Sequence, residues 1–389
     1  MQEIVLKYGC NPNQIPARIY TEGKLPVKVL SGNPGYINFL DAFNAWQLVK
    51  ELKEMLGKPA AASFKHVSPA GAAIAMELSE VDKVVFSAEK SELSPIASAY
   101  VRARGADRLC SFGDFIALSD ECDESCARII RKEVSDGIIA PSFSDEALNI
   151  LGRKRNGAYN IISIDAGYTP KPIELREVFG ITFEQGRNDI KIGESMLGEM
   201  VTVNKEMPET AKRDLLISLI TLKYTQSNSV CYVENGQTIG VGAGQQSRIH
   251  CTRLAGDKAD IFHLRRHPKV LELPFSDKVS GPDRDNTIDT YISGALFEPG
   301  NERVISEVLK ERPEPLSKEE KTEYISGIRG VSLGSDAFFP FSDSIERAYK
   351  SGVDYIVQAG GSVRDCEIIE AADRYKMVMA FCRTRFFHH

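Results

Sequence analysis

The sequence predicts an α/β fold made of two related units and a helical insertion. Stretches typical of strands alternate with stretches typical of helices along most of the chain, and this alternation favours helices layered on a sheet. With 389 residues, the chain exceeds the roughly 250–300 residues at which a single core stops growing. Motifs at residues 111–139 recur in the same order, with gaps that differ by several residues, at residues 332–357, which suggests a duplicated α/β unit.

In the first half, turn signals such as Asn11-Pro12 separate the expected elements. Apolar residues recur every three or four positions from Phe39 to Leu52, which predicts a buried helix. Ser68 and Pro69 are typical of a helix start, so a helix is expected over residues 71–78. Other helices are expected at residues 95–104 and 126–130, and strands at residues 3–8, 59–62, 111–118 and 137–140.

In the second half, residues 142–207 show little regular pattern. A long helix is expected to follow Pro208, and Asn235-Gly236 predicts a hairpin, because this dipeptide fits a two-residue turn. Residues 260–328 indicate a charged, mainly helical insertion, in which Ser317 and Glu320 have the spacing of a capping box. The remaining elements are expected as a helix near residues 345–349, a strand at 354–357, a helix after 360–362 and a strand at 377–381.

These patterns divide the chain into four segments. The expected boundaries are 1–165 for the first α/β unit, 166–259 for the first part of the second unit, 260–328 for the insertion and 329–389 for the completion of the second unit.

The composition restricts the partners and the compartment. A formal net charge of −6 offers no electrostatic attraction to nucleic acid or to an anionic membrane surface. An anionic ligand would therefore need a local basic cluster. The eight cysteines include no C-x-x-C pair, and no apolar run is long enough to span a membrane. The sequence therefore predicts a cytoplasmic protein with reduced, mostly buried thiols.

One stretch, Ser63–Gly71, places Lys65 beside His66 between an expected strand and an expected helix. A helix start offers free N–H groups and a partial positive charge, which suit an anion. Lys65 and His66 are therefore candidates for catalysis beside an anion site. The alternative is a solvated lysine and a core histidine bonded to the backbone, and the spacing of these two residues leaves it open.

Several known motifs are missing. The glycines of residues 240–250 do not have the G-x-G-x-x-G spacing of a dinucleotide site, and there is no phosphate-binding G-x-x-x-x-G-K-[ST] loop. The zinc-deaminase pair H-x-E and P-C-x-x-C, the H-E-x-x-H motif and the G-x-S-x-G elbow are also missing. Zinc and serine-hydrolase chemistry therefore have no support. The glycine-rich stretch still places Arg248 at an expected helix start.

Five stretches together resemble the AICAR transformylase family, the transformylase half of the bifunctional purine-biosynthesis enzyme. They are Ser63–Gly71, Lys223–Val230, Gly242–Leu254, Ser335–Phe341 and Arg385–His389. The resemblance implies two cytidine-deaminase-like α/β units without zinc, with the helical insertion in the second unit. It also implies a homodimer with active sites at the subunit interface. Because residue 1 already begins the transformylase region, a free-standing transformylase without the cyclohydrolase domain is expected.

The resemblance implies transfer of a formyl group from 10-formyltetrahydrofolate to the 5-amino group of AICAR, an imidazole ribonucleotide. By position, His66 resembles the general base, Lys65 its cationic partner and Asn228 an orienting amide. The amine is a poor nucleophile, because its lone pair is delocalised. A base that removes its proton during attack would therefore help by a factor of about 10²–10⁴. Lys65 could hold His66 neutral and stabilise an oxyanion.

Further positions match the two substrates. The ribonucleotide side comprises Lys7, Tyr8, Gly113, Asp136, Arg248, Phe338 and Arg385, and the folate side comprises Ile249, Pro340, Asp343, Ser362 and Val363. Lys7 stands where the family usually has arginine, which replaces a planar fork with a point charge. At the folate positions, ordinary packing remains an alternative role.

Two other functions stay open. A nucleotide-binding regulator on the same scaffold would not need the set of Lys65, His66 and Asn228, and a deaminase-like hydrolase would need a metal. The expected co-substrate is 10-formyltetrahydrofolate, with no catalytic metal. The residues leave open whether a monovalent cation binds.

Overall fold

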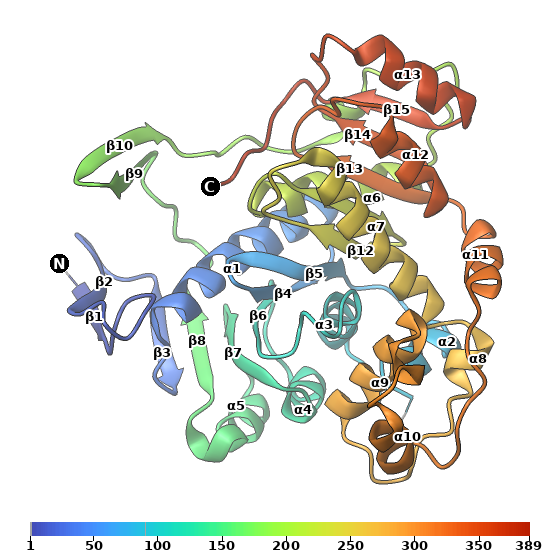
Figure 1. Cartoon of the computed structure of the whole chain (residues 1–389). Coiled ribbons are helices and arrows are strands. Elements are labelled where there is room, and N and C mark those ends of the chain that lie inside the picture. Colours follow the sequence, from blue (N-terminus) through green and yellow to red (C-terminus); the bar gives the residue numbers. More distant parts are fainter. Residues whose placement is uncertain (1, 90) are drawn as a thin grey trace.

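The computed structural model describes residues 2–89 and 91–389, and a large mixed β-sheet forms its centre (Figure 1). The strands of this sheet, in spatial order, are β15 (Val378–Phe381), β14 (Val353–Gln358), β13 (Val331–Ser335), β11 (Val230–Glu234), β12 (Gln237–Gly242), β5 (Ser68–Ile74), β4 (Ala60–Lys65), β6 (Asp114–Leu118), β7 (Ser135–Ala140), β8 (Asn160–Ile164) and β3 (Val27–Ser31). Two separate hairpins comprise β1 (Gln2–Leu6) with β2 (Ala17–Thr21) and β9 (Ile173–Val178) with β10 (Ile181–Gly186). The expected α/β class is confirmed.

Helices lie on both faces of the sheet and in the segment between α7 and β13. They are α1 (Tyr36–Leu56), α2 (Glu80–Val85), α3 (Pro95–Gly105), α4 (Glu124–Lys132), α5 (Asp145–Leu151), α6 (Glu209–Lys223), α7 (Arg248–Leu264), α8 (Pro268–Leu271), α9 (Gly281–Ser293), α10 (Glu302–Val308), α11 (Lys318–Ser326), α12 (Asp343–Lys350) and α13 (Asp365–Arg374). Short 3₁₀ turns occur at Lys154–Gly157, Glu194–Leu197 and Ala295–Phe297.

The same order of elements occurs twice. Each half has a helix, an antiparallel hairpin, a second helix and then three strands that are parallel to one another. In the first half these are α1, β4–β5, α3 and β6–β7–β8, and in the second they are α6, β11–β12, α7 and β13–β14–β15. The halves meet where β5 and β12 pair antiparallel, with Ala73 opposite Gln237. In the sequence echo between the halves, residues 136–139 and 354–357 fall on the equivalent strands β7 and β14, whereas residues 111–113 lie in a turn and residues 332–334 lie in β13.

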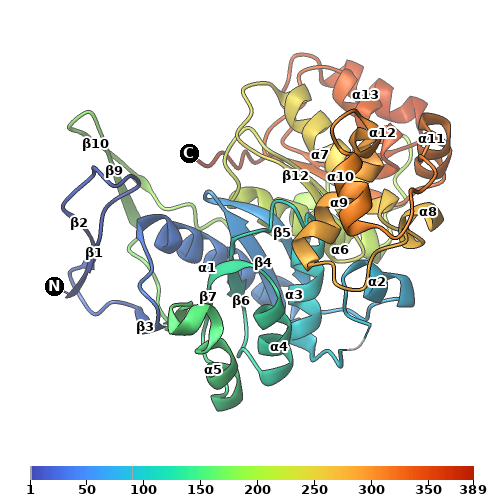
Figure 2. The same cartoon turned by 60° about the horizontal axis from the view of Figure 1, so that its bottom comes forward.

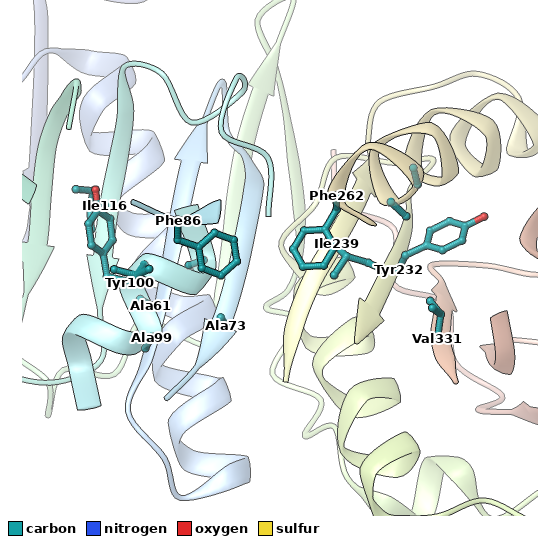
Figure 3. Packing of buried hydrophobic residues seen from close by; sticks show 14 of the residues in the cluster. Ala61, Ala73, Phe86, Ala99, Tyr100, Ile116, Tyr232, Ile239, Phe262 and Val331 are labelled. Atoms are coloured by element: carbon teal, nitrogen blue, oxygen red, sulfur yellow. The ribbon is translucent and has the colours of Figure 1, made fainter. Parts of the chain in front are cut away.

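Alternate residues of the central strands enter two different cores. Ala61 and Ile116 belong to the core under α3, α4, α5, α7, α12 and α13, whereas Ala62 and Ala117 belong to the core under α1 and α6. This alternation is the normal period of a strand buried on both faces. Figure 3 shows the first core crossing the junction of the halves, where the ring centroids of Phe86 and Phe262 lie 6.5 Å apart.

The segment between α7 and β13 has a core of its own. Helices α8 to α11 pack around residues such as Leu264, Tyr291 and Leu316, and they lie together at one end of the molecule (Figures 1 and 2). The Ser317 hydroxyl accepts a hydrogen bond from the Glu320 N–H, and the Glu320 carboxylate accepts one from the Ser317 N–H. The predicted capping box is therefore confirmed, and the segment expected as an insertion is mainly helical.

The predicted helix over residues 71–78 is wrong. Ser68–Ile74 forms β5, and Ser68 and Pro69 begin this strand. The physical reason is the close approach of α3: a Cβ atom on Gly71 would lie 2.1 Å from the Ala103 carbonyl oxygen. Small residues let a buried strand and a helix touch, and this requirement overrides local helix preference. The anion site expected at a helix N-terminus beside His66 is therefore absent.

Two smaller differences concern strand positions. The strand expected at residues 111–118 begins only at Asp114, because residues 111–113 form a turn. The segment expected to be irregular contains the β9–β10 hairpin, whose residues are all exposed. Within residues 2–89 and 91–389, all eight cysteines are free thiols, and no helix is long and apolar enough to cross a membrane.

Candidate active site

His66 lies in the turn of the β4–β5 hairpin. Lys65 ends β4 and pairs with Ser68 at the start of β5, so His66 and Val67 form a two-residue turn. Their φ angles are 53° and 61°, as a type I′ turn requires. Because the strand ends at Lys65, the His66 side chain is exposed rather than directed into the sheet. The turn therefore takes His66 out of the alternation of the strand.

Lys65 reaches the turn before β6. Its Nζ donates a 2.6 Å hydrogen bond to the Phe112 carbonyl oxygen, and a Cβ atom on Gly113 would lie 4.0 Å from the same Nζ. The pairing of β4 with β6 produces this proximity. Asp136 lies on the next strand, β7, and accepts a 2.7 Å hydrogen bond from Arg155. Lys65, His66, Gly113 and Asp136 thus share one region of the first half.

Asn228 lies in the segment between α6 and β11, and its amide makes three hydrogen bonds to protein groups. Its Oδ1 accepts a 3.0 Å hydrogen bond from Arg248, and its Nδ2 donates to the carbonyl oxygens of Gln245 and Gln246 at 3.0 and 3.2 Å. Arg248 itself is buried, with 6% of its surface exposed. It is paired with Asp336 and donates a 2.7 Å hydrogen bond to the Ser229 carbonyl oxygen. Arg248 therefore fixes Asn228, and its guanidinium is directed to protein groups.

Asp336 bonds to several groups around Asn228 and Arg248. Its carboxylate accepts hydrogen bonds from the Ser227 hydroxyl at 2.6 Å and from the Ser229 N–H at 3.0 Å, besides its pairing with Arg248. Its carbonyl oxygen accepts a 2.8 Å hydrogen bond from the Phe386 N–H. Asp336 therefore joins the Asn228 segment, the start of α7 and the C-terminal tail that carries Arg385.

The Lys65–His66 region and the Asn228–Asp336 cluster meet at the ends of the middle strands of the sheet. The Gln226 N–H lies 3.4 Å from the Ser68 hydroxyl, which joins the Asn228 segment to the His66 hairpin. The tail closes over the same place, because the Ser227 N–H donates to the His388 carbonyl oxygen at 3.0 Å. Burial lowers the pKa of His388.

Nearly all the expected site residues lie along one side of the sheet, the side formed by the ends of its strands. Because β5 and β12 are antiparallel, strands β6 and β7 begin at the edge where β13, β14 and β15 end. The residues at or shortly beyond these strand ends are Lys65, His66, Gly113, Asp136, Asn228, Arg248, Ile249, Phe338, Pro340, Asp343, Ser362, Val363 and Arg385. Several of the second-half side chains are exposed, including Phe338 at 42% and Val363 at 102%.

Lys7 and Tyr8 are placed differently. They follow β1, and the Lys7 Nζ lies 6.0 Å from the centre of the Tyr8 ring. In both whole-chain views the β1–β2 hairpin lies away from β4 and β5 (Figures 1 and 2). In the part of the chain that the structure describes, no hydrogen bond or ion pair joins Lys7 or Tyr8 to the His66 hairpin.

Three buried aspartates beside the site were not identified from the sequence. They are Asp41, which accepts a hydrogen bond from the Val67 N–H, Asp114 beside Ser63, and Asp336. Burial raises the pKa of the Asp114 carboxyl, although Arg104 lies 2.9 Å away. A signal was present, because each aspartate has an apolar residue beside it in the sequence. No group of three or more His, Cys, Asp or Glu side chains suited to a metal occurs among the described residues.

The fold and site define an α/β protein with a repeated unit and a polar, partly basic site along one sheet edge. The family model described as AICARFT/IMPCHase bienzyme matches residues 1–258. The chain therefore belongs to the AICARFT/IMPCHase bienzyme family, as the five motifs predicted.

Similar proteins include three called bifunctional purine biosynthesis protein PurH. The chain is 29% identical to that of Bartonella bacilliformis over 397 residues, 29% identical to that of Polynucleobacter necessarius over 392 residues, and 31% identical to that of Ruegeria sp. over 396 residues. These matches cover 99–100% of this chain but only 58–59% of each relative. The chain thus spans about 59% of the length of these relatives.

Proposed function

We propose that this protein transfers a formyl group from 10-formyltetrahydrofolate to the 5-amino group of AICAR. Family membership supports a place in purine biosynthesis. The observation that carries the specific reaction is the convergence of Lys65, His66 and the Asn228 cluster at one sheet edge. These residues come from both halves of the chain, and the reaction needs a base, a cation and an orienting amide at one place.

In this proposal His66 acts as the general base. The AICAR amine attacks the formyl carbon, a C–N bond forms, and His66 accepts the proton that the nitrogen loses. The C–N bond to the folate then breaks, and the folate nitrogen takes up a proton. The exposed position of His66 in the turn leaves its ring accessible to substrate. A well-placed general base contributes a factor of about 10²–10⁴.

Lys65 stabilises the oxyanion that forms on the formyl carbon during attack, because a fixed ammonium group interacts strongly with developing charge. The Phe112 carbonyl oxygen holds its Nζ beside Gly113. Asn228 orients the base or the substrate carboxamide. Because Arg248 is paired with Asp336, it contributes by fixing Asn228, and the exposed Arg385 is better placed for the substrate phosphate.

The second half supplies the folate side in this proposal. Ile249, Pro340, Asp343, Ser362 and Val363 lie near the ends of β12, β13 and β14, where the exposed apolar side chain of Val363 suits a flat aromatic ring system. We also propose that the halves are cytidine-deaminase-like units with the boundaries 1–165, 166–259, 260–328 and 329–389. The repeated order of elements supports this division.

We further propose a homodimer whose sites combine residues of both chains. The position of Lys7 and Tyr8 away from the His66 hairpin supports this arrangement, because a site within one chain would not include them (Figure 1). A second subunit could supply both residues to the edge.

The proposal is tested by following tetrahydrofolate release spectroscopically with AICAR and 10-formyltetrahydrofolate present. His66→Ala should lower kcat by about 10²-fold or more, because it removes the base, while AICAR binding stays close to that of the original protein. His267→Ala is the control, since His267 caps α8 in the insertion and should leave kcat unchanged. AICAR binding without any turnover by the original protein would instead indicate a nucleotide-binding regulator.

A further inference from the structure

The two halves contain the same hairpin, but the residues in its turn are very different. In the second half, β11 and β12 are joined by Asn235 and Gly236 at φ angles of 48° and 76°, and this dipeptide suits a type I′ turn. In the first half the same two positions hold His66 and Val67, at φ angles of 53° and 61°. A β-branched residue at positive φ is a genuine outlier. The sequence of the first turn therefore does not favour its own conformation.

In both halves an aspartate on the preceding helix holds the turn. The Val67 N–H donates a 2.6 Å hydrogen bond to Oδ1 of Asp41, and the Gly236 N–H donates a 2.7 Å hydrogen bond to Oδ1 of Asp214. Asp41 lies five positions after Tyr36, the first residue of α1, and Asp214 lies five positions after Glu209, the first residue of α6. The two contacts are therefore equivalent in the repeated unit.

The surroundings of the two aspartates differ. Asp214 also accepts a 2.8 Å hydrogen bond from Arg213, whereas Asp41 forms no ion pair with a lysine or arginine among the residues that the structure describes. Asp41 is 6% exposed, and the titratable groups that face it are His66 in the turn, Asp136 on β7 and Asp114 on β6. A buried carboxylate without a cationic partner is costly, so its presence beside the turn needs a reason.

We propose that Asp41 is a positioning residue that holds the strained His66–Val67 turn, and thereby His66, in the geometry needed for proton removal. This inference rests on the proposed function of His66. Without the Asp41 carboxylate, the turn loses the one side-chain acceptor that the structure gives to the Val67 N–H. The hairpin is then free to adopt turns that Val67 prefers, and each of these moves the His66 ring.

The arrangement also makes the turn sensitive to acid. Burial raises the pKa of Asp41 to about 6, while the hydrogen bond from Val67 and the proximity of His66 act in the opposite direction. As the pH falls through about 6, Asp41 takes up a proton and becomes a weaker acceptor. The turn should therefore be held less firmly below pH 6 than above it.

The test compares Asp41→Ala and Asp41→Asn with the matched variants Asp214→Ala and Asp214→Asn. Asp41→Ala should lower kcat by about 10–100-fold with a smaller change in the KM for AICAR, because orientation rather than binding is lost. Asp41→Asn keeps an acceptor oxygen and should recover part of kcat. In this variant kcat should also fall less steeply at acid pH than in the original protein. The Asp214 variants, compared at equal amounts of folded protein, should stay within about twofold of the original kcat.

Amide hydrogen exchange of the peptide Ser63–Gly71 gives a readout that does not need activity. Asp41→Ala should exchange faster in this peptide, and Asp214→Ala should exchange faster only around Gly236. Equal losses of kcat in the Asp41→Ala and Asp214→Ala variants, or unchanged exchange of Ser63–Gly71 in Asp41→Ala, would overturn the positioning role. Absence of formyl transfer by the original protein would overturn the proposed function and leave the exchange result to decide whether Asp41 holds the turn.

Discussion

Val67 shows how a single backbone conformation marks the site. Residues held in sparsely populated conformations cost about 1–3 kcal/mol each and persist only where their surroundings impose them. Val67 has a φ angle of 61° and sits next to the proposed base. The equivalent position of the other half is Gly236, which adopts positive φ without this cost. At this position of the repeated hairpin, the strain of a β-branched residue at positive φ therefore occurs in the half whose turn carries His66.

Val67→Gly should raise the free energy of unfolding by about 1 kcal/mol, because it removes strain that exceeds the added flexibility of glycine in the unfolded chain. Gly236→Val should lower it, since a Cβ atom there would lie 2.6 Å from the Met76 sulfur and the φ angle is 76°. Urea unfolding of both variants measures these changes. If Val67→Gly destabilised the protein as much as Gly236→Val, the His66–Val67 turn would not be strained.

At the scale of the element, the β5 and β12 strands depend on close contact with helices. A Cβ atom on Gly71 would lie 2.1 Å from the Ala103 carbonyl oxygen of α3, and one on Gly240 would lie 2.1 Å from the Ala255 carbonyl oxygen of α7. These glycines are therefore equivalent, and each lets a helix touch the strand of its half that lies at the junction of the halves. The contact keeps Ser68–Ile74 extended although its residues are small.

Gly71→Ala and Gly240→Ala should each lower the free energy of unfolding by about 1–3 kcal/mol, because the added methyl group must displace the helix. Gly71→Ala should also lower formyl transfer, since β5 carries the His66 turn at its start. Thermal unfolding checks the first expectation. Gly281→Ala serves as the control, as nothing lies within 4 Å of a Cβ atom at Gly281. Equal stability of all three variants would contradict the contact argument.

At the scale of the whole molecule, the β9–β10 hairpin stands away from the sheet (Figure 1). Its apolar residues are exposed, including Leu175 at 66%, Phe179 at 100% and Phe183 at 59%. An isolated two-stranded hairpin is marginally stable at best in water. We therefore expect the proposed homodimer to bury this hairpin.

Sedimentation should show a dimer for the original protein, and the double substitution Leu175→Glu with Phe183→Glu should shift it toward monomer, because charges would replace apolar contacts at the interface. Formyl transfer should fall with it, as the proposed sites combine both chains. Thr182→Glu adds a charge on the same hairpin without removing an apolar side chain and serves as the control. A double variant that remained dimeric would show that the hairpin lies outside the interface.

The sequence by itself determined the elements whose signals are local. The periodic apolar residues of α1, the Asn235-Gly236 turn and the Ser317 capping box each depend on neighbours within a few positions. It also determined the family, because five long motifs carry that information. Local signals of this kind are independent of where the rest of the chain lies.

Only the tertiary structure decided what the Ser63–Gly71 stretch becomes. Small residues after Ser68 are compatible with a helix or with a buried strand, and contact with α3 selects the strand. The roles of Asp41 and Asp336 also depend on contacts between residues far apart in the chain. The convergence of His66 with Asn228 follows from the antiparallel pairing of β5 with β12, which brings opposite strand ends to one edge. No local pattern specifies that pairing, because it arises from the packing of two whole units.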